Sequence, residues 1–194
     1  MWQFFADMTS QSLGSIVSRG ELIRKIRIPR WIIVLSSSFS ALINLGLNII
    51  VVSGFLFLND VQFLNSSLWF PLILIEVYIF ALGLSFFLAA AFVKYRDISY
   101  IWEVVLQAGF YATPILYTLS QIPNPTFQKI LMLNPMAQAI QDARYSIITH
   151  QSPTIFRLFD NSFLIAVPFM VVILAFIVGL LYFKKESKYF AENL

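Results

Sequence analysis

The chain contains no cysteine and a single histidine, His150, and only 12% of its 194 residues are charged. Without cysteine there is no disulfide framework and no thiolate metal site, and one histidine does not form a metal cluster by itself. We also find no G-x-x-x-x-G-K-[ST] phosphate loop, no nucleophile elbow and no H-E-x-x-H pair. The sequence therefore predicts a protein without a metal site or catalytic machinery, in which any ATP is bound by another chain.

Hydrophobic residues take the place of the missing charge, at 59% of the chain and a mean hydropathy of +0.78. Four segments are nearly uncharged over the roughly 20 residues that a membrane-spanning helix needs: 31–58, 68–93, 98–122 and 162–183. They show no apolar–polar alternation, which excludes the strands of a membrane barrel. We predict an all-α polytopic membrane protein, folded as one transmembrane domain over residues 1–194 with four full transmembrane helices.

The basic residues are concentrated in three places, which predicts the orientation of the chain in the membrane. Ten of the thirteen Lys and Arg residues lie before the first span, between the second and third, or after the fourth: Arg19, Arg24, Lys25, Arg27, Arg30, Lys94, Arg96, Lys184, Lys185 and Lys188. The positive-inside rule places both ends of the chain, including the tail 184–194, in the cytoplasm. The net charge of +3 then comes mostly from basic residues that orient the chain in the membrane, so it is not evidence that the protein binds nucleic acid.

Six of these ten basic residues lie in two short cytoplasmic segments. In the turn between the second and third spans, Lys94 and Arg96 anchor the helix ends and Asp97 is a candidate N-cap for the helix beginning near Ile98. In the segment 21–30, apolar residues share one side of a short helix and basic residues the other, and Pro29 ends it: Leu22, Ile23 and Ile26 against Arg24, Lys25 and Arg27. This segment is either an anchor on anionic membrane lipids or a docking surface.

Residues 123–160 lie outside by this topology but are not a polar loop. Asn124-Pro125 and Asn134-Pro135 are each typical of a helix start, with asparagine as N-cap and proline at the first helical position. The two short helices that follow are re-entrant helices beside a pathway, or an amphipathic pair lying flat on the outer surface.

Two carboxylates fall inside the predicted spans. Glu76 lies about a third of the way into the second span. Its carboxylate either takes part in the function of the protein or has a purely structural role. Glu103 lies close to the cytoplasmic interface, where we expect it to reach the surface or pair with Arg96.

Three stretches carry a resemblance to a known family: "LIRKIRIPRWIIVLSSSFSALINLGLNIIVV", "FVKYRDISYIWEVVLQAGFYATPILY" and "LNPMAQAIQDARYSI". In order and spacing they closely resemble the membrane subunits of type-2 ABC exporters that move polysaccharides, O-antigens and teichoic acids. The most specific part is "KYRD", followed by an aromatic-rich helix that ends in "TPILY" and then by "NP" and Arg144. The resemblance covers essentially the whole chain.

This resemblance implies a homodimer of six-span permease subunits with two copies of a separate ABC ATPase, in the cytoplasmic membrane of a bacterium. The ATP and Mg would be on the ATPase, and the substrate would be a lipid-linked glycan or polyol phosphate. Residues 21–30 would include the coupling helix, and the helices of residues 123–160 would be the outer gate. An interfacial helix, the first span and most of the second normally precede the part that resembles residues 1–20, so we expect an N-terminally truncated permease.

The candidate residues of the channel and gate are one carboxylate, five aromatic residues, one proline and one arginine: Glu76, Tyr100, Trp102, Phe110, Tyr111, Tyr117, Pro114 and Arg144. The aromatic residues either line a glycan path or belong to the belts at the membrane interfaces. Alternative functions are a type-2 permease for a small molecule such as a drug, a secondary transporter using Glu76, and a membrane enzyme acting on a lipid-linked glycan. We find neither the inverted repeats of the secondary transporter nor a catalytic cluster for the enzyme.

Overall fold

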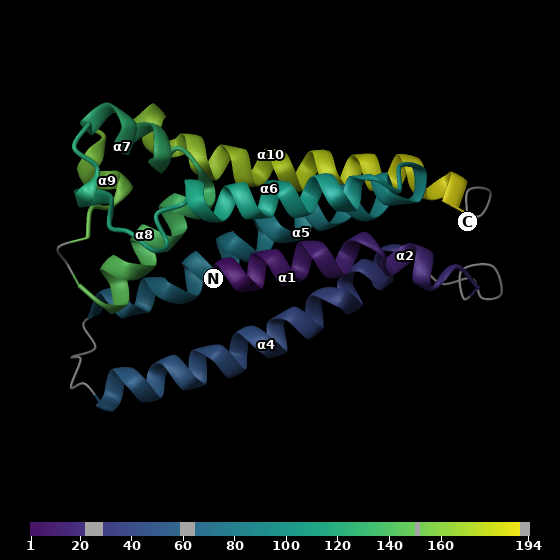
Figure 1. The fold of residues 1–194 in the computed structure, drawn as a ribbon, viewed down its shortest axis with the longest axis horizontal. Helices are drawn as coiled ribbons and strands as arrows, with labels where there is room; N and C mark the ends of the chain where they lie inside the picture. The colour runs from purple at the N-terminus through teal and green to yellow at the C-terminus, as the bar shows by residue number, and fades with distance from the viewer. Residues whose placement is uncertain (22–28, 59–64, 150–151, 191–194) are drawn as a thin grey trace.

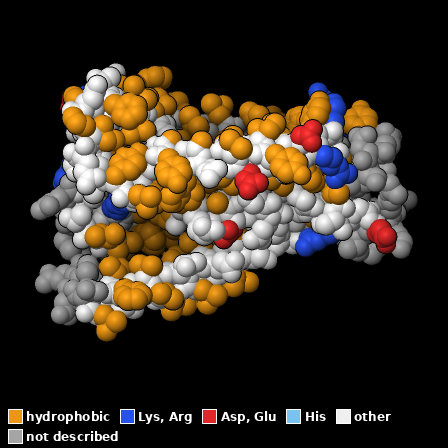
Figure 2. Space-filling view, viewed as in Figure 1, with side chains coloured by type: hydrophobic (Ala, Val, Ile, Leu, Met, Phe, Trp, Pro, Cys, Tyr) orange, Lys and Arg blue, Asp and Glu red, His pale blue; other side chains and the backbone are white. Residues whose placement is uncertain are grey.

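The computed structural model describes residues 1–21, 29–58, 65–149 and 152–190, and within these ranges the regular elements are all helices. Three helices are long and apolar enough to cross a membrane: α4 (Trp31–Leu58), α5 (Phe70–Lys94, preceded by the 3-10 helix η1, Asn65–Trp69) and α10 (Ser162–Glu186, followed by η3, Ser187–Tyr189). The long helices run along one axis, and shorter helices gather at one end (Figure 1). Hydrophobic side chains are spread widely over the face shown in Figure 2.

The segment predicted as the third span is not one continuous helix. Helix α6 (Ile98–Ala112) has 15 residues, about 22 Å at 1.5 Å per residue, which is shorter than the ~30 Å hydrocarbon core. The helix ends at Thr113, which has extended backbone (φ −95°, ψ 135°). Pro114 sterically disfavours the helical conformation in the residue before it and has no N–H to donate. The prediction of a helix through residue 122 is therefore wrong, and a fourth span is not confirmed.

Helix α1 (Trp2–Leu13) lies at the centre of the bundle and packs against α4, α5 and α6. The Phe5 ring stacks on Phe80 at 5.4 Å between centroids, and the indole N–H of Trp102 in α6 donates to Thr9 Oγ1 at 3.1 Å. The short helix α2 (Ser15–Ser18) continues from α1 and also contacts α4 and α5. Helix α1 thus links α6 to α4 and α5, and α6 also contacts α5 directly.

Helix α4 packs against the bundle mainly along its first half. Its buried residues lie between Ile33 and Leu45, and none follows Leu45. Figure 1 shows the rest of α4 diverging from α1 and α5. The second half carries large exposed apolar side chains such as Phe55 and Phe57, which suit contact with lipid or with another protein chain.

The short helices α7 (Pro125–Met132), α8 (Pro135–Ile147) and α9 (Ile155–Leu158) lie at the end of the bundle away from residues 94–97. Both predicted asparagine caps are confirmed. The Asn124 side chain accepts from the N–H of Thr126 at 2.9 Å, and the Asn134 side chain accepts from the N–H of Met136 at 3.0 Å. Asp97 occupies the N-cap position of α6 as predicted, but its side chain makes no capping hydrogen bond.

A small apolar core holds α7 and α9 together with the 3-10 helix η2 (Leu119–Gln121). It is formed by Leu119, Met132, Ile155 and Phe159. Helix α8 contacts α7 and packs against α5, α10 and η1. The segment between α6 and α10 is therefore a packed cap on one end of the bundle.

Candidate functional site

The first part of the site is the break at the end of α6. Backbone that leaves a helix at membrane depth loses its internal partners, so its carbonyls need donors from elsewhere. Helix α8 supplies them, because Gln141 Nε2 donates to the carbonyl of Pro114 at 3.4 Å and Arg144 donates to the carbonyls of Ile115 and, at 3.3 Å, Tyr117. The predicted residues Pro114, Tyr117 and Arg144 thus meet in one place.

Helix α8 presents these donors because Gln141 and Arg144 lie three residues apart, on one side of the helix. Met136, Ile140 and Ala143 are buried on its apolar side, in agreement with its apolar periodicity. Gln141 is also buried, at 1% exposed, since it lies under the turn that it caps. Polar side chains of α8 therefore stabilise the non-helical turn after α6.

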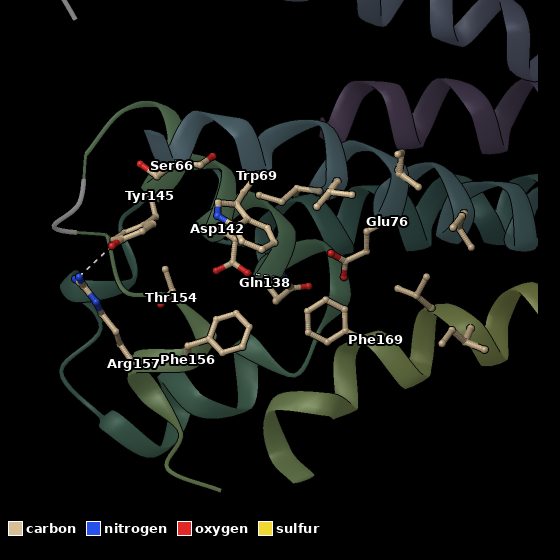
Figure 3. A pocket seen from close by; sticks show the side chains of 17 residues that line it. Ser66, Trp69, Glu76, Gln138, Asp142, Tyr145, Thr154, Phe156, Arg157 and Phe169 are labelled. Atoms are coloured by element: carbon tan, nitrogen blue, oxygen red, sulfur yellow. Dashed lines mark hydrogen bonds between the residues drawn. The ribbon is translucent and has the colours of Figure 1, made fainter. Parts of the chain in front are cut away.

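The second part of the site is a polar cluster around Glu76 of α5. It includes Gln138 and Asp142 of α8, in which Gln138 Nε2 donates to Asp142 Oδ2 at 2.7 Å. Figure 3 shows the Glu76 and Gln138 side chains pointing toward one another from two different helices. The buried oxygens Glu76 Oε1, Gln138 Oε1 and Asp142 Oδ1 have no hydrogen-bond donor.

This cluster lines a cavity of about 730 Å³ between η1, α5, α8, α9 and α10. Its other walls are mainly aliphatic and aromatic, and Figure 3 shows the rings of Trp69, Tyr145, Phe156 and Phe169 around it. Arg157 lies over the Tyr145 ring at 4.8 Å from its centroid and donates to the Tyr145 hydroxyl at 3.2 Å. The cavity therefore has acceptor atoms set into an apolar wall.

Burial raises the pKa of Asp142 above its ordinary value of 3.8. The hydrogen bond from Gln138, and after it the backbone N–H of Ile155, act in the opposite direction because they stabilise the carboxylate. Burial is the largest of these effects, so the net shift is upward and the carboxyl gains a proton more readily than an exposed aspartate.

The other aromatic candidates are not gathered at the cavity. Tyr100 and Tyr111 are 71% and 67% exposed on α6, and Phe110 packs edge-on against Trp2 with 6.1 Å between ring centroids. Trp102 is held by Thr9 as described above, and the Tyr117 hydroxyl donates to the carbonyl of Tyr111 at 3.3 Å. A role for them in lining a path stays a prediction.

At the opposite end of the bundle, Lys94, Arg96 and Asp97 are exposed, as a turn at a membrane surface requires. Lys94 Nζ lies 5.4 Å from the centroid of the Tyr95 ring, and the Arg96 guanidinium lies 5.3 Å from that of Phe92. Six residues predicted to couple to an ATPase lie outside the described residues: Leu22, Ile23, Arg24, Lys25, Ile26 and Arg27. Pro29 is described and lies just before α4, exposed.

Sequence reasoning found Glu76 but missed Gln138 and Asp142, which lie beside it in the structure. A signal was available, because Asp142 is an acidic residue in a short apolar helix, as Glu76 is in a long one. Gln138 precedes it by four residues, on the same side of that helix. Among the described residues no group of three or more His, Cys, Asp or Glu side chains comes together as a metal site.

A family model described as ABC-2 type transporter matches residues 1–148, which include the break after α6 and all of α8. The chain belongs to this family. It is similar over its whole length to two O-antigen export system permease proteins RfbA of Klebsiella pneumoniae, each 31% identical over 198 residues that make up 71% of the relative. The RfbA protein of Myxococcus xanthus is 26% identical over 200 residues, 72% of its length. ABC-2 members are transport permeases rather than enzymes, in agreement with the prediction of a non-enzymatic subunit.

Proposed function

We propose that this chain is the permease subunit of an ABC exporter that moves a lipid-linked polysaccharide outward across the bacterial cytoplasmic membrane. The observation that carries the proposal is the similarity of the whole chain to permeases named for O-antigen export. O-antigens are polysaccharides, and a long polymer needs a pathway that opens and closes around it. A polyol phosphate polymer belongs to the same class of substrate.

The proposed outer gate is the turn after α6 together with α7 and α8. Non-helical backbone at membrane depth is tolerated where protein or a water-filled cavity covers it. Arg144 and Gln141 provide this cover for the carbonyls of residues 114, 115 and 117. A pathway lined by such a turn opens when α8 and the turn separate, and closes when the hydrogen bonds between them re-form.

The proposed orientation places residues 94–97 and the C-terminal end of the chain in the cytoplasm, with α7, α8 and α9 at the outer side. The N-terminal residue lies partway along the bundle at the start of α1 (Figure 1), and α1 leads from it toward the cytoplasmic end. The exposed Lys94 and Arg96 lie at one end of the bundle and the short helices at the other (Figure 1), so the positive-inside rule gives a consistent direction. In this orientation the 15-residue helix α6 and the turn after it together form the fourth crossing.

The proposed partners are a second copy of the permease and two copies of an ABC ATPase that bind ATP and Mg. Helix α6 has no buried residue and exposes Tyr100, Ile101 and Val104, which makes it a suitable surface for the second permease copy. Residues 21–30 are the proposed ATPase-docking segment, and their basic side chains also suit contact with membrane lipids.

Deletion of the gene in its host tests this function. We expect the surface polysaccharide to disappear and its lipid-linked form to accumulate inside the cell, and expression of the chain from a plasmid to reverse both effects. Extraction of surface and internal glycans, followed by gel electrophoresis, measures the outcome. An unchanged surface polysaccharide in the deletion strain would exclude the proposed substrate class.

A further inference from the structure

The cavity beside α5 has an unusual set of buried polar atoms. Glu76 Oε1, Gln138 Oε1 and Asp142 Oδ1 are buried without a hydrogen-bond donor, and all three residues line the cavity. Each of these atoms is an acceptor when the acids are ionised. Since a buried acceptor without a donor is costly, the ionised cluster gains stability when a group in the cavity donates hydrogen bonds to it; protonation of one acid is the other way to supply a donor.

The hydrogen bond that Gln138 makes shows which of its side-chain atoms lacks a partner. Its side chain is 1% exposed, and its amide nitrogen is already committed to Asp142 Oδ2 at 2.7 Å. Its amide oxygen is therefore the atom left over for the cavity, close to the Glu76 carboxyl in Figure 3. An amide and two carboxyls from two helices thus form one acceptor site.

The walls around this site are apolar and aromatic. Figure 3 shows the rings of Trp69, Phe156 and Phe169 around the same space as Glu76 and Gln138. Aromatic faces attract cations, most strongly where water is excluded. Arg157, the one basic residue among those lining the cavity, lies at the opposite end from Glu76 in Figure 3 and packs on Tyr145.

We propose that this cavity binds an organic cation, a protonated amine on an apolar body, with its ammonium group held by Glu76, Gln138 and Asp142. An ammonium has three N–H donors and no acceptor, which matches three acceptors without donors. Its positive charge also offsets part of the negative charge of the two carboxylates, which is costly to bury alone. The apolar body occupies the aliphatic and aromatic part of the 730 Å³ cavity.

Other ligands match the cluster less well. A neutral polyol donates hydrogen bonds but leaves the charge of the carboxylates uncompensated, and the mainly apolar wall offers few partners for its remaining hydroxyls. A hard metal cation such as Ca²⁺ takes six to eight oxygen ligands, more than this cluster offers. The proposed site concerns a ligand other than the exported glycan and stands independently of the proposed function.

The test uses two probes of the same shape, 1-adamantylamine and 1-adamantanol, titrated at neutral pH onto the full chain in lipid nanodiscs. Isothermal titration calorimetry measures binding, and empty nanodiscs give the background of partitioning into lipid. We expect saturable binding of the amine and at least about tenfold weaker binding of the alcohol, which keeps the shape and loses the charge. Equal binding of both probes, or no saturable binding of the amine, would overturn the proposal.

Variants assign the binding to the cluster. Glu76→Gln and Asp142→Asn keep side-chain size and remove one charge each, and we expect each to weaken amine binding about tenfold or more. Glu103→Gln makes the same chemical change on the exposed side of α6 and should bind as the unmodified chain does. If the two cluster variants fold, as judged by their thermal unfolding, and bind the amine at full affinity, the ammonium does not sit at this cluster.

Discussion

Gly83 of α5 and Gly179 of α10 meet backbone to backbone in the middle of the bundle. A Cβ on Gly179 would overlap the carbonyl oxygen of Gly83, and a Cβ on Gly83 would lie 2.5 Å from the Cα of Phe176. Small residues at such crossings let membrane helices approach closely, and van der Waals packing then holds them together. The contact places α10 against α5 and thereby shapes one wall of the cavity.

Replacing either glycine should destabilise the protein. For Gly83→Ala and Gly179→Ala we expect the free energy of unfolding to fall by about 1–3 kcal/mol or more, because the added methyl group meets rigid backbone. The matched controls are Gly46→Ala and Gly54→Ala in α4, where an added Cβ has no neighbour within 4 Å apart from the backbone of its own helix. In these controls alanine improves helix propensity by up to about 1 kcal/mol. Thermal unfolding in detergent measures all four, and equal effects at all four positions would contradict the close contact.

Removing the Arg144 guanidinium should weaken the turn after α6. In Arg144→Met the carbonyls of Ile115 and Tyr117 lose their donor, and we expect a cost of about 1–3 kcal/mol for each carbonyl that stays buried. Arg144→Lys keeps the charge but not the planar guanidinium that donates to two acceptors. The stability of the turn in this variant should therefore lie between that of the unmodified chain and that of Arg144→Met. Proteolysis of the turn in membranes measures its stability. A methionine variant as resistant as the unmodified chain would show that other groups cap the turn.

The raised pKa of Asp142 predicts a stability that depends on pH. Between the ordinary value of 3.8 and the raised value in the folded protein, the folded state binds more protons than the unfolded state. The contribution of this carboxyl to the free energy of unfolding is therefore greatest at low pH, and it is lost as the pH rises through the folded-state pKa. Asp142→Asn should flatten the fall in stability over this range, whereas Asp160→Asn, at an exposed residue, should not. Parallel curves for the unmodified chain and Asp142→Asn would contradict the shift.

The proposed orientation predicts that residues 152 and 187 face opposite sides of the membrane. Because the chain has no cysteine, Ser152→Cys and Ser187→Cys can each be labelled with a membrane-impermeant maleimide without removing any other thiol. We expect Cys at 152 to react in intact spheroplasts and Cys at 187 to react only after the membrane is opened. Reaction of both from the same side would exclude a membrane crossing by α10, the helix that separates the two residues.

The proposed ATPase-docking segment makes a different prediction for its apolar and basic residues. Buried apolar side chains carry most of the energy of a docked interface, and charges at its rim mainly set orientation and rate. Leu22→Asp or Ile26→Asp should therefore abolish co-purification with the ATPase while the permease still inserts, and exchanging Arg24, Lys25 and Arg27 should matter less. If the aspartate variants still bind the ATPase, residues 21–30 act only as a lipid anchor and docking belongs to residues 94–97.

Features encoded locally were predictable from the sequence. Asn124-Pro125 and Asn134-Pro135 start helices because asparagine and proline satisfy the first turn by themselves, and Glu76 stands out as a charge in an apolar run. The end of α6 was misplaced because the prediction followed the length of the uncharged run. Pro114 and its effect on Thr113 determine the end instead, through a local steric rule that composition does not show.

Contacts between distant segments were not predictable in the same way. Asp142 lies beside Glu76 only because α8 folds back against α5, and nothing in a single sequence gives the distance between residues 66 positions apart. The pairing of Gly83 with Gly179 is of the same kind, since glycine in an apolar helix is common and only the packed structure shows its partner. The donors from Arg144 to Ile115 and Tyr117 also depend on how α8 is placed.

The most direct measurement is ATP-driven export in a defined system. The chain and its co-purifying ATPase are reconstituted in vesicles with the ATPase outside, lipid-linked polysaccharide is added to the outer leaflet, and the glycan protected inside the vesicles is measured. We predict protected glycan that increases with time, requires ATP and Mg, and is lost when the permease is left out. Continued hydrolysis of ATP without any protected glycan, or protection that is the same without ATP, would contradict the account.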